Sequence, residues 1–366
     1  MSFPLPCQLR SLKLKTKYQL ASGLVFGAML AFSPALYAQV KEVQVTAKAE
    51  TNSIIGDADD PAIWVNPADP LGSLVLGTDK YNGMHVYDLK GAEVAFFNDG
   101  AVNNVDLRQF TLAGRTVWLA SATERDNEDI VFYVIEADGK IDRATPHAFP
   151  AMPDTTERMR NIYGHAMARD SATGRVWTLT NYKSGHIVQY EVIDDNGQIK
   201  LEFARMFKVA TQPEGIVADD TAGHIYVGEE DAGIWRFPML PEDGDAVTQI
   251  AAIPSDCFPK DDIEGLAIYD GADARYLVVS AQGIHRAAFI PLNGEDVMPC
   301  VGLAEIAASA SIDGVSETDG LDVVSTPLGP DYPEGMLVMM DDQNEDLQTN
   351  FKYISFAEVK AALGLK

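Results

Sequence analysis

A short phrase of an acidic residue, a glycine and an apolar run recurs in this chain of 366 residues. The clear copies are residues 213–218 (PEGIVA), 263–268 (IEGLAI) and 318–323 (TDGLDV). Looser copies stand at residues 59–64, 104–108 and 162–167. Each copy precedes runs that are rich in β-branched and aromatic residues, which are typical of strands. A phrase that returns about every 50 residues predicts an array of equivalent structural units.

The six copies start near residues 60, 105, 162, 213, 263 and 318, and their spacing is that of a four-stranded blade. Strands are expected at residues 73–78, 84–87, 116–120, 131–134, 276–280 and 336–340. Asp-Gly or Asn-Gly pairs, as at residues 194–198, supply the tight turns between strands. The sequence therefore predicts an all-β protein with the fold of a six-bladed β-propeller. A short C-terminal helix is expected at residues 355–365, where Phe356, Val359 and Leu363 have helical spacing.

The N-terminus has the composition of a secretory signal. Four basic residues precede an apolar stretch at residues 20–36, and the sequence Tyr37-Ala38-Gln39 suits cleavage after Ala38. A membrane anchor is the alternative, although Ser22, Gly23 and Pro34 interrupt the apolar core. We expect residues 1–38 to be removed and residues 39–366 to form one propeller domain that is secreted or periplasmic.

Two further features follow from export. Cys257 and Cys300 would enter an oxidising compartment, where a disulfide and a pair of buried thiols are both open interpretations. Loss of the four basic residues takes the formal net charge from −26 to −30. Such acidity excludes nucleic acid as a partner and suits a soluble monomer that has no membrane contact after signal removal.

Charged residues at equivalent places of the units are sorted by sign. The ends of the second strands carry Lys80, Arg125 and Lys183 in the first three units. Units four and six carry acidic runs there, at residues 229–231 and 341–342. The position of the repeated phrase adds Asp60, Tyr163, Glu214, Glu264 and Asp319. Since equivalent positions of blades face the same end of the channel, cations and carboxylates should meet there.

This sorting suggests a two-part site. Clustered carboxylates repel one another unless a cation bridges them, and oxygen ligands without His or Cys favour calcium or magnesium, of which calcium suits many flexible oxygens best. Lysine, arginine and a tyrosine hydroxyl suit phosphate. The alternative is that these charges only solvate the mouth of the channel. Residues 342–347 resemble a helix-loop-helix calcium loop but lack its glycine. The sequence also lacks the nucleophilic Cys and His motifs of covalent phosphatases and the Gly-x-Ser-x-Gly motif of serine hydrolases.

Several motifs together resemble the beta-propeller phytases of the secreted bacterial 3-phytase type. They lie at residues 59–64, 103–108, 214–215, 229–235, 262–266 and 318–322, and the resemblance runs from about Ala47 to the C-terminus. It implies a six-bladed propeller that hydrolyses calcium-phytate, myo-inositol hexakisphosphate, to lower inositol phosphates, with several Ca²⁺ ions as cofactors. Tyr81 and Ser184 depart from the family, which often has Lys and Glu at these positions.

The resemblance also implies roles for individual residues. Phosphate contacts are expected from Lys80, Arg125, Tyr163 and Lys183, which with Glu214 form the catalytic set. Active-site calcium ligands are expected at Asp60, Glu214, Glu230, Asp262, Glu264 and Asp319. Asp313 and Asp341, joined by Glu50, are expected to hold a structural calcium.

The expected mechanism is in-line attack of a calcium-activated water on phosphorus, while the cations offset charge on the phosphoryl oxygens. Two other classes stay open: a secreted calcium-dependent propeller lactonase and a propeller that binds a ligand without catalysis. The lactonase does not require the cations Lys80, Arg125 and Lys183, so phosphate release from phytate against lactone turnover separates it from a phytase. A binding protein would show calcium-dependent affinity for phytate without phosphate release.

Overall fold

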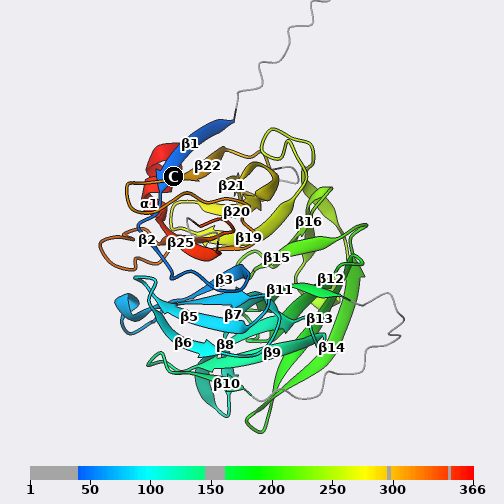
Figure 1. Ribbon diagram of the computed structural model, residues 1–366. Coiled ribbons are helices and arrows are strands. Elements are labelled where there is room, and N and C mark those ends of the chain that lie inside the picture. Colours follow the sequence, from blue (N-terminus) through cyan, green and yellow to red (C-terminus); the bar gives the residue numbers. More distant parts are fainter. Residues whose placement is uncertain (1–39, 145–160, 295–297, 345–347) are drawn as a thin grey trace, which may run out of the picture. The chain divides into compact units, whose positions relative to one another are not determined.

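The structure is a computed structural model that describes residues 40–144, 161–294, 298–344 and 348–366, so the predicted signal sequence lies outside it. The described chain forms six small sheets arranged as a six-bladed propeller (Figure 1). The predicted fold class is thus confirmed. No helix among the described residues is long and apolar enough to span a membrane.

The sheets follow one another along the chain. The first three contain β3 (Ala58–Trp64), β4 (Leu74–Asp79), β5 (Gly83–Asp88) and β6 (Glu93–Phe97); β7 (Val102–Leu112), β8 (Arg115–Glu124), β9 (Asp129–Ile135) and β10 (Ile141–Ala144); and β11 (Ile162–Arg169), β12 (Val176–Tyr182), β13 (His186–Asp195) and β14 (Gln198–Lys208). The fourth contains β15 (Pro213–Asp219), β16 (His224–Glu229), β17 (Gly233–Pro238) and β18 (Thr248–Ala252).

The last two sheets each take one strand from the N-terminus. The fifth contains β19 (Ile263–Asp270), β20 (Arg275–Ala281), β21 (Arg286–Pro291) and β22 (Gly302–Ala307), and β1 (Lys41–Thr46) pairs with β22 in parallel. The sixth contains β23 (Leu321–Val324), β24 (Met336–Asp341) and β25 (Asn350–Ser355), and β2 (Ala49–Glu50) pairs with β25. The N-terminal segment therefore bridges the two sheets that complete the ring.

The strands β3, β7, β11, β15, β19 and β23 are the innermost strands, and each packs against the next around the ring (Figure 1). An apolar cluster fills the space between each pair of neighbouring sheets in the described chain. Both faces of a middle strand such as β24 are consequently buried along its whole length. This explains why the sequence shows apolar runs there instead of strict alternation.

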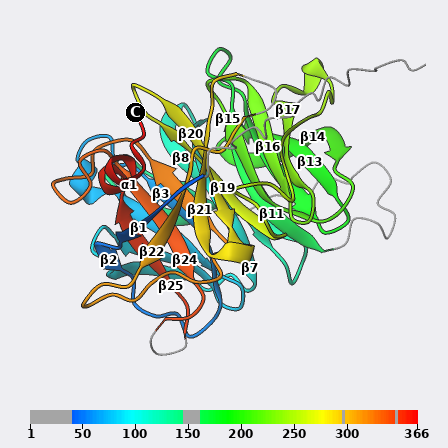
Figure 2. The same cartoon turned by 90° about the horizontal axis from the view of Figure 1, so that it is seen from above.

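The C-terminal helix is confirmed as α1 (Phe356–Leu363), which buries Phe356, Val359 and Leu363. It lies against β1 and β22 (Figure 2). Short 3₁₀ turns occur at Pro70–Gly72, Pro241–Asp243 and Gln282–Ile284. Cys257 and Cys300 form a disulfide, which links the segment after the fourth sheet to the segment before β22.

The repeated phrase lies in a β-bulge at the start of the innermost strands. In five of the sheets the pairing register shifts there. The pairs of residues within the bulges are Asp59-Asp60, Asn103-Asn104, Tyr163-Gly164, Glu214-Gly215 and Glu264-Gly265. Asp59, and not the expected Asp60, is thus in register with Glu214 and Glu264. A bulge re-aims side chains, and here it directs one residue of each phrase to a shared end of the ring.

The glycine of the phrase has a steric cause. A Cβ atom on Gly215 would lie 2.0 Å from the carbonyl oxygen of Glu264, in the next blade. The same holds one blade earlier, where a Cβ on Gly164 would lie 1.9 Å from the carbonyl oxygen of Glu214. Glycine is therefore needed because the backbone that carries the next acidic residue approaches too closely for any side chain.

Candidate active site

The residues that follow the second strand of each blade form a ring. Their backbone N–H groups donate to the residue just before the innermost strand, as Lys80 does to Asp57 at 2.8 Å and Lys183 to Asn161 at 3.1 Å. The six equivalent positions hold Lys80, Arg125, Lys183, Glu230, Gln282 and Asp342. The sequence-based sorting by sign is retained: three cations in succession, then mainly acidic or amide side chains.

The three cations line one cavity of about 540 Å³, together with Asp57 and Tyr81. Lys183 Nζ lies 3.9 Å from the centre of the Tyr163 ring, and the Arg125 guanidinium lies 5.9 Å from the same ring. Within the described chain neither Arg125 nor Lys183 forms an ion pair with a carboxylate. Two cations that form no ion pair among the described residues, held beside an aromatic ring at a cavity wall, have the chemistry that binds an anion.

Carboxylates gather next to these cations. Glu214, Glu230 and Glu264 each present an oxygen within 4.8 Å of the others. Glu214 and Glu264 are buried, and so is Asp59 in the bulge of the first blade. Both carboxylate oxygens of Asp59 and one of Glu264 have no hydrogen-bond partner among the described residues. Buried carboxylate oxygens without a donor are costly, and a bound cation would satisfy them.

The pKa values of the clustered carboxylates are raised, mainly by burial. Burial raises the pKa of Glu264 well above its usual range, and repulsion from Glu214 adds to this. Burial also raises the pKa of Glu230 to about 7. In Asp319, burial raises the pKa to about 6 although the Lys80 ammonium acts in the opposite direction. Such shifts are the response of carboxylates that are buried and lie close to one another.

Lys80 joins the two halves of the site. Its Nζ donates to Asp319 Oδ2 at 2.6 Å and lies 3.4 Å from Asp57 and 3.5 Å from Asp59. Burial by itself would lower the pKa of Lys80, but Asp59 and Asp319 raise it overall. The side chain therefore stays an ammonium. It balances part of the negative charge while it also faces the cavity of the other two cations.

Asn103 makes a second link between the halves. It is fully buried, and its Nδ2 donates to Glu214 Oε1 at 3.0 Å while its Oδ1 accepts from Arg125 Nη1 at 3.2 Å. Burial and the nearby Glu214 and Glu264 raise the pKa of Tyr163, so its hydroxyl keeps its proton. Asp57, Asp59 and Asn103 were not among the expected site residues, although Asp59 and Asn103 lie within the quoted motifs.

Two expected calcium ligands lie apart from the centre of this cluster. The Asp60 carboxylate accepts the backbone N–H of Val105 at 3.0 Å and lines a different cavity of about 250 Å³, with Asp106 and Asp322. Asp262 follows the fourth blade with a positive φ of 83°, and its N–H donates to the Glu230 carbonyl. Burial raises the pKa of Asp262, and hydrogen bonding to Glu264 lowers it. Asp262 therefore lies at the rim of the carboxylate cluster.

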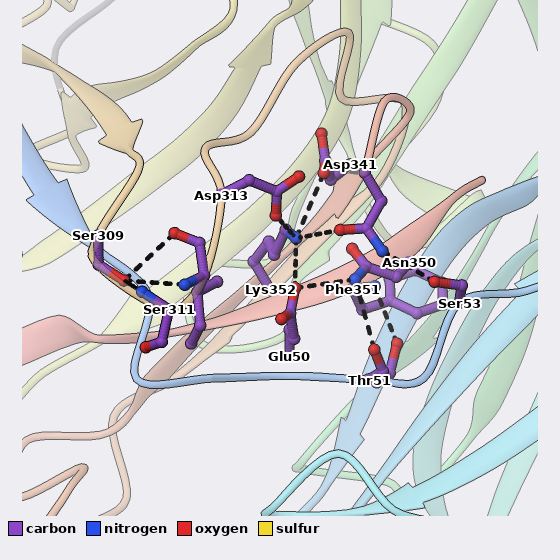
Figure 3. Close-up of polar contacts among 12 residues, drawn as sticks. Glu50, Thr51, Ser53, Ser309, Ser311, Asp313, Asp341, Asn350, Phe351 and Lys352 are labelled. Atoms are coloured by element: carbon purple, nitrogen blue, oxygen red, sulfur yellow. Dashed lines mark hydrogen bonds and ion pairs between the residues drawn. The ribbon is translucent and has the colours of Figure 1, made fainter. Parts of the chain in front are cut away.

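The expected structural calcium ligands form a separate group in the sixth blade. Glu50, Asp313 and Asp341 surround the Nζ atom of the fully buried Lys352 (Figure 3). Both acidic groups contain an ammonium: Lys80 lies among Asp57, Asp59 and Asp319, and Lys352 among Glu50, Asp313 and Asp341. They differ in how the ammonium is held. Lys352 is fully buried and donates three hydrogen bonds, whereas Lys80 donates one among the described residues.

Comparison with known proteins gives consistent results. A sequence profile of the phytase family matches residues 13–366. A 3-phytase of Bacillus subtilis (strain 168) is 36% identical over 334 residues, which cover 88% of this chain and 86% of that protein. Among solved structures, an Aleuria aurantia lectin in complex with α-methyl-L-fucoside has a TM-score of 0.49 at 11% identity. That alignment covers 83% of this chain and 93% of the lectin chain, and it is too distant to bear on the site.

Proposed function

Because the chain belongs to the phytase family, it is an enzyme that hydrolyses phytate, and we propose that it does so with calcium held by the carboxylate cluster. The observation that carries this proposal is the adjacency of two kinds of unsatisfied charge. Arg125 and Lys183 form no ion pair with a carboxylate in the described chain. Among the same residues, Glu264 has a carboxylate oxygen without a hydrogen-bond donor, and the carboxylate of Asp59 accepts no hydrogen bond and has only the Lys80 ammonium nearby, at 3.5 Å. A phosphate bound to the cations and calcium bound to the carboxylates would satisfy both.

The residues of the chain bind and orient the substrate in this proposal. Arg125 and Lys183 hold phosphoryl oxygens at the cavity wall, and Lys80 holds an oxygen at the boundary with the carboxylates. The face of the Tyr163 ring contacts the Lys183 ammonium, and the Tyr163 hydroxyl keeps its proton, so it can donate a hydrogen bond. Calcium, when bound by Glu214, Glu230, Glu264, Asp59 and Asp319, would supply an activated water and offset charge in the transition state.

The large net negative charge of the chain also supports a role for divalent ions in substrate capture. The formal net charge of −26 would repel a polyanion such as phytate. Divalent ions that associate with phytate and with the carboxylates would reduce this repulsion.

We further propose that the enzyme is exported after removal of residues 1–38 and acts as a monomer.

The test is phosphate release from phytate by residues 39–366, with and without calcium. Removing calcium with excess chelator should abolish release, and adding calcium back should restore it. Lys183→Ala should lower kcat/KM by about 10- to 100-fold because it removes a charged contact to phosphate. Glu214→Ala should lower kcat and weaken calcium affinity. Lys208→Ala, at an exposed lysine on β14, is the matched control and should leave the rate unchanged.

Four outcomes would contradict the proposal. Full activity in excess chelator, with calcium absent by assay, would exclude calcium from the reaction. Unchanged rates in both Lys183→Ala and Glu214→Ala would exclude this site. Turnover of lactones without release of phosphate would favour the lactonase alternative, and calcium-dependent phytate binding without release would favour a binding protein.

A further inference from the structure

Lys352 lies in an unusual environment for a lysine. It belongs to β25, opposite Glu50 of β2 and Met339 of β24, and its side chain is 0% exposed. Lysine is rarely buried to this extent unless its charge is matched. The structure accordingly surrounds its Nζ atom with oxygen atoms (Figure 3).

Four side chains from three segments supply these oxygens. Nζ donates to Glu50 Oε2 at 2.5 Å, to Asp313 Oδ1 and to Asn344 Oδ1 at 3.1 Å, and Asp341 Oδ2 lies 3.4 Å away. Glu50 comes from the N-terminal segment, Asp313 from the connection between β22 and β23, and the other two from β24 and the turn after it. The ammonium thus connects all the parts of the sixth blade that are distant in sequence.

Two of the three carboxylates also have donors other than Lys352, whereas Asp341 Oδ2 has no hydrogen-bond partner among the described residues. Asp341 accepts the N–H of Ser316 at 2.9 Å and its hydroxyl at 3.1 Å. Glu50 accepts from Asn350 Nδ2 at 3.1 Å. These hydrogen bonds offset part of the negative charge that one ammonium leaves uncompensated.

This geometry does not fit a calcium ion at the same place. Calcium requires six to eight oxygens at about 2.3–2.6 Å. Here the oxygens of Glu50, Asp313 and Asn344 converge on a nitrogen. An ion could take that position only if the buried ammonium left it, and the displaced charge would lose its partners.

We propose that Lys352 is the internal cation of the sixth blade and takes the place of the structural calcium expected at Asp313, Asp341 and Glu50. The ammonium holds the N-terminal strand β2 against β25 and so helps to close the ring without a metal. The stability of the closed ring then does not depend on calcium at this place, and the calcium requirement belongs to the active site.

The test compares bound calcium and thermal stability in four proteins: the wild type, Asp313→Asn, Lys352→Met and the double variant. Methionine keeps an unbranched chain of similar length and removes the charge. Equilibrium dialysis gives the number of calcium ions per chain, and the melting temperature is measured with calcium and with chelator. Lys48→Met, at a lysine that is one-third exposed and pairs with Glu358, is the matched control.

With Lys352 present, Asp313→Asn should leave the number of bound calcium ions unchanged. Lys352→Met should lower the melting temperature measured in chelator. In this variant calcium should raise the melting temperature, and about one additional calcium ion should bind per chain. The double variant should show neither the rise nor the additional ion. The proposal is overturned if Asp313→Asn costs the wild type one bound ion. It is also overturned if Lys352→Met melts in chelator at the wild-type temperature. Should Lys352→Met fail to fold, the Asp313→Asn comparison still decides.

Discussion

At the scale of single residues, Asn103 has the position best suited to coordinate the two halves of the site. One side-chain amide contacts both a carboxylate, Glu214, and a cation, Arg125, of the cavity that Lys80 and Lys183 also line. Its Nδ2 also donates to Asn104 Oδ1 at 2.7 Å, so the amide orientation is fixed from a third direction. Asn103 is thus a positioning residue, which acts through Glu214 and Arg125 and need not contact the substrate.

We predict that Asn103→Ala lowers kcat/KM for phytate by about 10-fold or more, because two hydrogen bonds to charged groups are lost. It should also weaken calcium affinity, since Glu214 loses the donor that orients it. Asn127→Ala is the control: Asn127 lies in the turn after Arg125 and bonds only Glu124 in the described chain. Steady-state kinetics and calcium titration provide the measurements. Equal effects of both variants, or an unchanged calcium affinity in Asn103→Ala, would contradict a positioning role.

Titration of the buried residue His165 is expected to make the stability of the protein depend on pH. It is buried between the hydroxyls of Ser121 and Thr180, and burial lowers its pKa to about 3. In the unfolded chain the group titrates near pH 6.5, so the unfolded state binds more protons between pH 6.5 and 3. The contribution of neutral His165 is therefore present above pH 6.5 and is lost as the pH falls.

We predict that this residue accounts for about 3 kcal/mol of the stability that the protein loses between pH 7 and pH 4. His165→Asn removes the titrating group and should show a decline in unfolding free energy that is smaller by about this amount. Denaturant unfolding at several pH values measures both proteins. Parallel pH profiles of wild type and variant would show that His165 does not contribute.

Residue assignments from the sequence were limited by local geometry. The cations Lys80, Arg125 and Lys183 could be aligned because they follow strands of regular pairing. Asp59 could not be distinguished from Asp60, because the bulge that sets the register depends on pairing with β4 and leaves no mark in the sequence. Lys352 was missed for a related reason: its partners lie on segments as far apart as Glu50 and Asp341.

At the scale of elements, the recurring bulge and its glycine decide how closely neighbouring blades approach. Gly320 donates its N–H to the carbonyl of Asp59 at 3.0 Å, and Gly265 donates to the carbonyl of Asp319 at 2.7 Å. Each contact brings an acid-bearing segment of one blade against the glycine of the previous blade. The spacing of the carboxylates is consequently fixed by backbone contacts between blades and not by the side chains themselves.

We predict that Gly215→Ala destabilises the protein by about 2 kcal/mol or more, because its Cβ would overlap the carbonyl of Glu264. Since relief of the overlap moves Glu264, calcium affinity and kcat should fall as well. Gly72→Ala is the control, because the nearest atom to its added Cβ is a side-chain nitrogen of Asn66 at 3.2 Å. Denaturant unfolding and calcium titration would be compared. A Gly215→Ala protein with normal stability and calcium affinity would contradict this account of the repeat.

At the scale of the whole molecule, the start of every blade was predictable and the closure of the ring was not. The repeated phrase marks the innermost strands because the same bulge and close approach recur in successive blades. The strands β1 and β2 belong to no repeat of their own, since each completes a blade built from the other end of the chain. Only the folded ring brings those segments together, and a local pattern carries no information about it.

This closure leads to a prediction about truncation. A chain of residues 51–366 lacks β1 and β2, so β22 and β25 become edge strands and Lys352 loses Glu50. Val45 and Ala47, both buried in the cluster between the last two blades, are also lost. We expect the unfolding free energy to fall by about 3 kcal/mol or more and the melting temperature by several degrees. Residues 40–366 provide the control, and thermal unfolding followed by circular dichroism is the measurement. Equal melting temperatures of the two chains would show that the N-terminal strands do not stabilise the closed ring.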